Sequence, residues 1–138
     1  MKLSLQGIED KQVWEEKGYH LPQYDIKRMV NNTKENPFWI HFGAGNLFRA
    51  FHANVVQNML NEGTLDRGLI VAEGFDYEII EKMYTVHDNL GILATLKADG
   101  TIEKSVTGSV AEALPLDSAD EAAYGRLKEI FAEDSLQM

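Results

Sequence analysis

Two glycines separated by one residue, Gly43 and Gly45, carry the clearest chemical signal in the sequence. A short apolar run, residues 38–42, precedes them, and a helical pattern follows without a proline. Gly43 permits a tight turn, because a Cβ would crowd the backbone where the chain reverses. Gly45 lets the backbone approach a pyrophosphate, while the N–H groups and dipole of the new helix attract its charge. This pattern predicts the strand, glycine turn and helix of a dinucleotide-binding βαβ unit, although a lone G-x-G also occurs in ordinary turns.

The predicted loop departs from the G-x-G-x-x-G pattern at its third glycine, where this chain has Phe48. That glycine allows close packing of helix on strand, so a phenylalanine implies a different placement of the helix. Arg49, in the first helical turn, is either a clamp for a phosphate or carboxylate or a solvated cation. The helix dipole disfavours a cation here unless an anion lies nearby. The candidate cofactor-binding residues of this loop are Gly43, Ala44, Gly45, Asn46, Leu47, Phe48 and Arg49.

An acidic residue, Glu73, follows a second apolar run at residues 68–72. A carboxylate at the end of the second strand can hold the ribose hydroxyls of adenosine, and it would repel a 2′-phosphate and so favour NAD over NADP. The spacing from Gly45 exceeds the compact interval of about 20 residues, so an exposed turn carboxylate is the alternative. Asp76 is a second candidate acid, and it is also a natural N-cap for a helix over residues 77–84.

Hydrophobic periodicity predicts the helices around the loop. The first helix carries two sets of apolar residues, Phe51, Val55 and Met59, and beside them Phe48, Val56 and Leu60. The helix over residues 77–84 has an apolar face made of Ile79, Ile80, Met83 and Tyr84. A last helix, capped by Asp117 or Ser118, should bury Ala122, Ala123, Leu127, Ile130 and Phe131.

A β-hairpin is predicted where residues 91–97 and 101–107 flank Ala98-Asp99-Gly100. Asp-Gly supplies the positive φ angles of a type I′ turn. Together the elements predict an α/β, Rossmann-like fold with a mainly parallel sheet and a β-hairpin extension. The dinucleotide-binding domain would span residues 38–138.

Residues 1–37, here called the leader, precede the predicted domain. Short helices are expected over residues 12–17 and 25–32, the second capped by Asp25. The leader is either a brace packed on the sheet or an arm on a second domain.

Composition excludes several classes of function. The chain has 138 residues, a net charge of −9 and no cysteine, which leaves no disulfide, thiolate metal site or cysteine nucleophile. The negative charge disfavours nucleic acid and anionic membrane partners. No apolar run approaches the roughly 20 residues of a membrane span, and no secretory signal is recognisable, so we expect a cytoplasmic protein. The histidines lack metal-ligand spacing, so no metal site is expected.

Two segments resemble a known family. His41-Phe-Gly-Ala-Gly-Asn-Leu-Phe-Arg-Ala50 resembles the G-x-G-x-F-x-R-A segment of the long-chain polyol and sugar-acid dehydrogenases, the mannitol dehydrogenase and mannonate oxidoreductase (fructuronate reductase) family. Leu21-Pro-Gln-Tyr-Asp25 resembles the P-x-Y-D-R segment upstream, although Ile26 replaces its arginine. The aromatic residue of the glycine motif is shifted by one position, from Leu47 to Phe48. The resemblance runs from about Leu21 to the last residue.

The resemblance implies an NAD cofactor, with Glu73 on the ribose. It also implies that Gly108-Ser109-Val110 returns the chain to the cofactor edge, where Ser109 would contact the nicotinamide side; otherwise Ser109 is a turn hydroxyl. The catalytic lysine of the family, with its asparagine and histidine companions, lies in a later helical domain. This chain would therefore be an N-terminal portion, truncated before that domain, with no catalytic residue and no hydride transfer of its own.

By overall likeness, the substrate pair would be D-mannonate and D-fructuronate, with D-mannitol and D-fructose next. Two other functions remain open from the residues themselves. An S-adenosylmethionine-binding domain uses the same strand, glycine turn and helix, and a non-catalytic scaffold could contain a glycine turn of purely architectural value.

Overall fold

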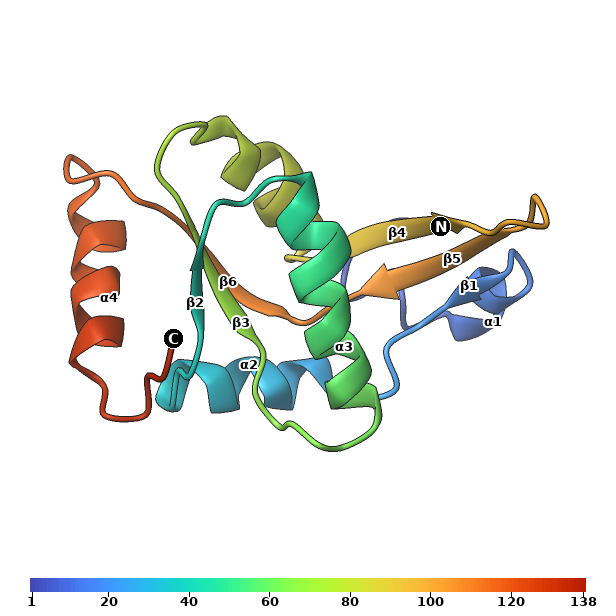
Figure 1. Cartoon of the computed structure of the whole chain (residues 1–138), viewed down its shortest axis with the longest axis horizontal. Coiled ribbons are helices and arrows are strands. Elements are labelled where there is room, and N and C mark those ends of the chain that lie inside the picture. Colours follow the sequence, from blue (N-terminus) through green and yellow to red (C-terminus); the bar gives the residue numbers. More distant parts are fainter.

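A parallel sheet of three strands forms the centre of the computed structural model, which describes residues 1–138 (Figure 1). Its strands are β2 (Ile40–Phe42), β3 (Leu69–Glu73) and β6 (Val110–Pro115), in the order β2-β3-β6. In the register, Ile40 lies opposite Ile70, and Ile70 lies opposite Glu112. The carboxyl ends of all three strands therefore meet at one edge, where ligands of open α/β sheets bind.

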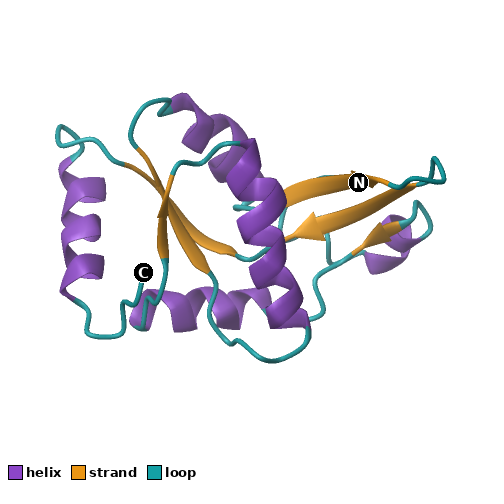
Figure 2. Cartoon of the chain, in the orientation of Figure 1, coloured by secondary structure: helices purple, strands orange, loops and turns teal.

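Helices cover both faces of this sheet (Figure 2), as they must because successive side chains of β3 point to opposite faces and are all buried from Leu69 to Ala72. Leu69 and Val71 pack against the face covered by α2 (Ile26–Glu35), α3 (Ala53–Asn61) and η2 (Ile80–Tyr84). Ile70 and Ala72 pack against α4 (Glu121–Ala132) on the other face. A strand buried on both faces is typical of doubly wound folds, so the predicted Rossmann-like layering is confirmed.

The predicted hairpin forms from β4 (Gly91–Leu96) and β5 (Ile102–Thr107), which pair antiparallel. The two-residue strand β1 (Tyr19–His20) adds in parallel to β5 and makes a second sheet, β1-β5-β4. The predicted turn type is wrong, because Gly100 has a positive φ of 85° and Asp99 does not. The N–H of Lys97 donates to the carbonyl of Thr101 at 2.9 Å, which closes a three-residue loop with glycine in the left-handed region.

The leader packs on both sheets. Helix α1 (Lys11–Glu15) buries Trp14 against the second sheet. Asp25 caps α2 as predicted, accepting from the N–H of Arg28 at 3.0 Å, and the helix extends to Glu35. Met29 lies in the core of the parallel sheet. Within this chain the leader therefore packs as a brace on the sheets.

The helix after β2 differs from its prediction. It opens with a π-helical turn, η1 (Phe48–His52), before continuing as α3. A π turn is wider than an α turn, so the positions beyond it rotate away from the expected phase. Phe48, Val56 and Leu60 are buried, whereas the recurrent set Phe51, Val55 and Met59 is exposed by 59%, 42% and 37%.

Two later helices also differ in detail. Residues 78–84 are helical, as predicted for 77–84, but most of this helix is the π-helical turn η2, which continues into the 3-10 turn η3 (Thr85–His87). The Asp76 side chain does not cap it. Asp120, and neither Asp117 nor Ser118, caps α4 by accepting from the N–H of Ala123 at 3.0 Å. Helix α4 buries the predicted Ala123, Leu127 and Ile130 but leaves Phe131 57% exposed.

The last residues run beside the outer edge of β2. The N–H of Gln137 donates to the carbonyl of Phe38 at 2.9 Å, and the N–H of Ile40 donates to the carbonyl of Met138 at 2.8 Å. No helix of the chain combines the length and the apolar character that crossing a membrane requires.

Candidate functional site

The turn between β2 and η1 is held by hydrogen bonds on both sides of Ala44. Gly43 has a φ of 110°, which favours glycine, and its N–H donates to the carbonyl of Ala72 at 2.8 Å. The N–H of the fully buried Ala44 donates to Oε2 of Glu73 at 2.8 Å. The hydroxyl of Tyr84, from η2, donates to the carbonyl of Ala44 at 2.8 Å. The turn is therefore fixed by two elements that follow it far along the chain.

Glu73 lies at the carboxyl end of β3, as the sequence predicted, and beside the glycine turn. Its second oxygen, Oε1, accepts from the N–H groups of Phe75 at 3.0 Å and Asp76 at 3.4 Å. The hydrogen bond from Ala44 is the main cause that holds the pKa of Glu73 below its usual range, while burial opposes it. The carboxylate is therefore ionised at neutral pH and puts a negative charge beside the glycine turn.

The backbone at Gly45 faces open space. A Cβ built on Gly45 would meet no atom within 4 Å, and its φ lies outside the left-handed region. Neither strain nor crowding inside the chain explains a glycine at this position. A ligand lying close to the backbone would explain it.

Arg49 remains close to the loop that precedes it. Its guanidinium contacts the side-chain oxygen of Asn46, and no carboxylate forms an ion pair with it. Both side chains line a cavity of about 380 Å³ between η1 and the base of the hairpin, which Met83 and His87 also line. Leu47, between them, is 74% exposed. The loop thus presents an unpaired cation close to the open backbone of Gly45.

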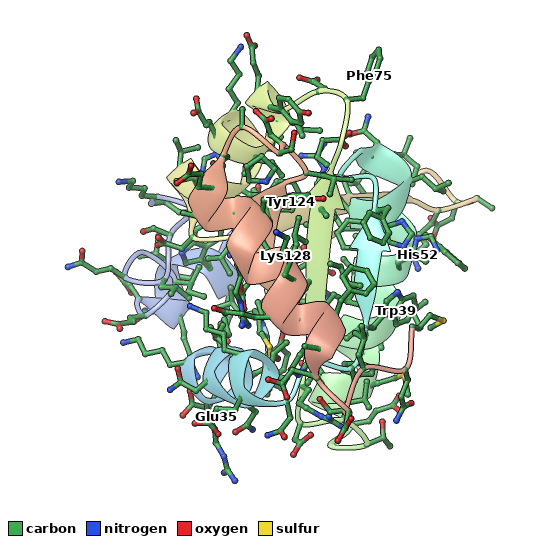
Figure 3. The ribbon with its side chains drawn as sticks, turned by 90° about the vertical axis from the view of Figure 1, so that its left-hand side faces the viewer. Glu35, Trp39, His52, Phe75, Tyr124 and Lys128 are labelled. Atoms are coloured by element: carbon green, nitrogen blue, oxygen red, sulfur yellow. The ribbon has the colours of Figure 1, made fainter.

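Phe48, in the place of the third glycine, belongs to the core. It is 2% exposed and stacks on His41, with ring centroids 4.8 Å apart. His41 and His52 also contact each other, with ring centroids at 4.5 Å. Trp39 and His52 project on the same side of the domain (Figure 3). Burial, and then the nearby His52, lower the pKa of His41. The different helix placement implied by Phe48 therefore takes the form of the π turn.

Ser109 lies away from the glycine turn. It precedes β6, its carbonyl accepts from the N–H of Leu69 at the amino end of β3, and its hydroxyl donates to the carbonyl of Ala53 at 2.6 Å. The side chain is fully buried. A residue at the amino end of the sheet cannot reach a ligand at the carboxyl end. The predicted contact of Ser109 with the nicotinamide side is therefore wrong, and its hydroxyl has a structural role instead.

Two residues near the turn were not among the sequence candidates. Tyr84 was assigned only to an apolar helix face, and its hydrogen bond to Ala44 spans 40 residues. Phe75 directly follows Glu73-Gly74 and is 95% exposed. The sequence could have indicated Phe75, because it is an aromatic residue in a turn directly after a candidate ribose acid. No sequence pattern identifies the contact of Tyr84 with Ala44.

One curated protein shows the relationship of the chain at the sequence level. No protein-family model matches the chain. The chain is 47% identical over 138 residues to the D-mannonate oxidoreductase of Thermotoga maritima, a match that covers 100% of this chain and 25% of that protein.

Solved structures show the relationship at the level of the fold. A D-sorbitol dehydrogenase in substrate-free form matches with a TM-score of 0.68 and 23% identity, over 92% of this chain and 24% of that chain. The Pseudomonas fluorescens mannitol 2-dehydrogenase, solved as a ternary complex with NAD and D-mannitol, matches with a TM-score of 0.69 and 22% identity. This match covers 94% of this chain and 24% of that chain. The chain spans about a quarter of the length of the proteins it matches.

Proposed function

The chain belongs to the mannitol dehydrogenase and mannonate oxidoreductase family, as its N-terminal domain, and on this premise we propose that it forms the NAD-binding part of a longer oxidoreductase. The observation that carries the proposal is the hydrogen bond from the N–H of Ala44 to Glu73, because a carboxylate that contacts the glycine turn is within reach of a ribose bound beside that turn. Bound NAD would accept a hydride from a carbinol carbon of a polyol or sugar acid, or its reduced form would return one.

The residues of this chain would bind and orient the cofactor. The pyrophosphate would lie against Gly45 and the N–H groups of Asn46 and Leu47, with Arg49 supplying a positive charge. Phe48 would support this loop from the core. Glu73 would accept the ribose hydroxyls with the lone pairs that its backbone donors leave free.

The carboxylate of Glu73 favours NAD over NADP, because a 2′-phosphate would lie against a negative charge. Titration of the complete native polypeptide with both cofactors should give a lower Kd for NAD. A lower Kd for NADP would contradict the assignment of Glu73.

Gly45→Ala tests the pyrophosphate contact. The new methyl group meets no atom of the chain, so the free energy of unfolding should change little, while the Kd for NAD should rise about tenfold or more. Gly45→Val, with a bulkier side chain, should raise the Kd further. Gly125→Ala is the matched control, because its Cβ also meets open space but lies on α4. An unchanged Kd in calorimetry for both Gly45 variants would show that the cofactor does not use this turn.

The same titrations separate the other candidate functions. S-adenosylmethionine offers no pyrophosphate to the unpaired Arg49, so the site favours NAD over it. A scaffold domain would bind neither ligand.

Identity to the relatives suggests the substrate. The chain is 47% identical to a D-mannonate oxidoreductase and 22–23% identical to the mannitol and sorbitol dehydrogenases. We therefore propose D-mannonate and D-fructuronate as the substrate pair, ahead of D-mannitol and D-fructose. Assays of the complete polypeptide with NAD and each of D-mannonate and D-mannitol should show the higher kcat/KM for D-mannonate.

A further inference from the structure

Phe75 is the most exposed large apolar side chain of the chain. It is 95% exposed, compared with 78% for Leu96 and 74% for Leu47. Figure 3 shows its ring projecting from the loop after β3, clear of the body of the domain. A single exposed apolar residue is common in proteins, so exposure alone assigns no role to Phe75.

The loop that carries Phe75 is fixed to the proposed cofactor site. The N–H of Phe75 donates to Oε1 of Glu73 at 3.0 Å, and that of Asp76 adds a longer contact at 3.4 Å. The other oxygen of the same carboxylate holds the N–H of Ala44 in the glycine turn. One carboxylate therefore joins the glycine turn to the backbone of Phe75.

The covalent order of a dinucleotide then determines what lies above this loop. In the adenine nucleotide half of NAD the ribose lies between the base and the phosphates. With the pyrophosphate at Gly45 and the ribose at Glu73, the base must continue past Glu73 over residues 74–76. Gly74 has no side chain and Asp76 is anionic, so Phe75 offers the only apolar surface of that turn.

We propose that Phe75 is the stacking partner of the adenine base of NAD. This inference rests on the proposed function and adds to it the residue that recognises the base. A phenyl ring and a purine stack face to face or edge to face without hydrogen bonds, so the contact needs only the flat, exposed ring that the loop presents. Tyr77, the next aromatic residue, instead donates its hydroxyl to the carbonyl of Leu116 at 3.2 Å.

Phe75→Ala in the complete native polypeptide tests the proposal, with NAD, AMP and nicotinamide mononucleotide as separate probes in calorimetry. The Kd for NAD and for AMP should rise by about five- to hundredfold, which is the range of base–aromatic stacking. The Kd for nicotinamide mononucleotide, which lacks adenine, should not change. Phe75→Trp, which keeps a flat ring, should retain the affinity for AMP. Leu96→Ala, at the next most exposed large apolar position, on the hairpin, is the control and should leave all three values unchanged.

Each other outcome has a distinct meaning. If the unaltered protein binds NAD and Phe75→Ala binds NAD and AMP equally well, the stacking role is wrong while the proposed function stands. If affinity for nicotinamide mononucleotide falls as much as that for AMP, Phe75 acts on the whole site and the stacking role is also wrong. If the unaltered protein does not bind NAD, the proposed function and this inference both fail.

Discussion

Oε2 of Glu73 lies 2.8 Å from the backbone nitrogen of Ala44, so the acid at the end of β3 holds the glycine turn at the end of β2. The same carboxylate accepts N–H groups from the loop that follows it. In a Rossmann-like fold these two loops contact different parts of one dinucleotide. Joining the two loops through a single side chain sets the distance between them, which would lower the ordering cost of binding a dinucleotide at the proposed site.

Glu73→Gln should loosen both loops. An amide carries no charge, and its single oxygen can replace only one of the two carboxylate oxygens that accept backbone N–H groups. The free energy of unfolding at pH 7 should therefore fall by about 1–3 kcal/mol. Urea unfolding measures this change, and NAD titration should show a higher Kd. Glu35→Gln, an exposed position on α2, is the control and should change neither quantity.

The effect of Glu73 also has a defined pH dependence. Its pKa in the folded protein is lower than in the unfolded chain, so the stability it contributes is complete above the unfolded value of about 4.5. That stability is lost as the pH falls through the folded value. The difference in unfolding free energy between the unaltered protein and Glu73→Gln should therefore shrink below about pH 4.5, and a difference that persisted there would contradict this account.

Tyr84→Phe should release the carbonyl of Ala44 while keeping the aromatic packing. Burial raises the pKa of Tyr84, so its hydroxyl stays protonated and remains a donor. Without that donor a buried carbonyl loses its partner, which should cost about 1–3 kcal/mol in urea unfolding. The Kd for NAD should rise as well. Tyr77→Phe is the matched control, because that exposed hydroxyl also donates to a backbone carbonyl but can be replaced by water.

The sequence was sufficient to predict the features that depend on neighbouring residues. The glycine turn, the position of Glu73 and the hairpin each follow from local backbone requirements and hydrophobic pattern. Asp25 as an N-cap follows from the same kind of local chemistry, and the structure confirms it.

The features that the sequence did not predict depend on packing between distant segments. The contact of Tyr84 with Ala44 depends on where η2 lies on the sheet, which no local pattern specifies. The buried face of α3 changed because Phe48 entered the core and a π turn followed. Buried Gln57 illustrates the same limit, because it bonds Tyr24, Val106 and Gly108 from what looks like a polar helix position.

Arg126→Ala should destabilise the domain strongly. Arg126 donates from Nε and Nη2 to both oxygens of Glu112, at 3.0 and 2.7 Å, and also to the carbonyl of Lys34 at 3.2 Å. Glu112 is only 9% exposed, so removing the guanidinium leaves a carboxylate uncompensated between β6 and α4. The expected loss in urea unfolding is about 3–5 kcal/mol. Lys82→Ala, which breaks the fully exposed ion pair with Glu78, is the control and should leave the free energy of unfolding almost unchanged.

His41→Phe should reduce the pH dependence of stability on the acid side of neutrality. Burial and the facing imidazole of His52 lower the pKa of His41 in the folded protein, whereas the unfolded chain keeps a value near 6.5. Below that pH the unfolded state takes up a proton that the folded state does not, so the free energy of unfolding falls as the pH decreases toward the folded value. One such proton contributes at most about 1.4 kcal/mol per pH unit.

A phenylalanine at position 41 can stack on Phe48 without titrating, so urea unfolding between pH 7.5 and 5.5 should show a shallower slope for the variant. His20→Phe, which removes an exposed imidazole on β1, is the control. If the free energy of unfolding depended equally on pH in His41→Phe and in the unaltered protein, His41 would take up its proton at the same pH in the folded and unfolded states. The two neighbouring imidazoles would then be sufficiently hydrated to carry the charge, and the contact between His41 and His52 would impose no penalty on stability at low pH.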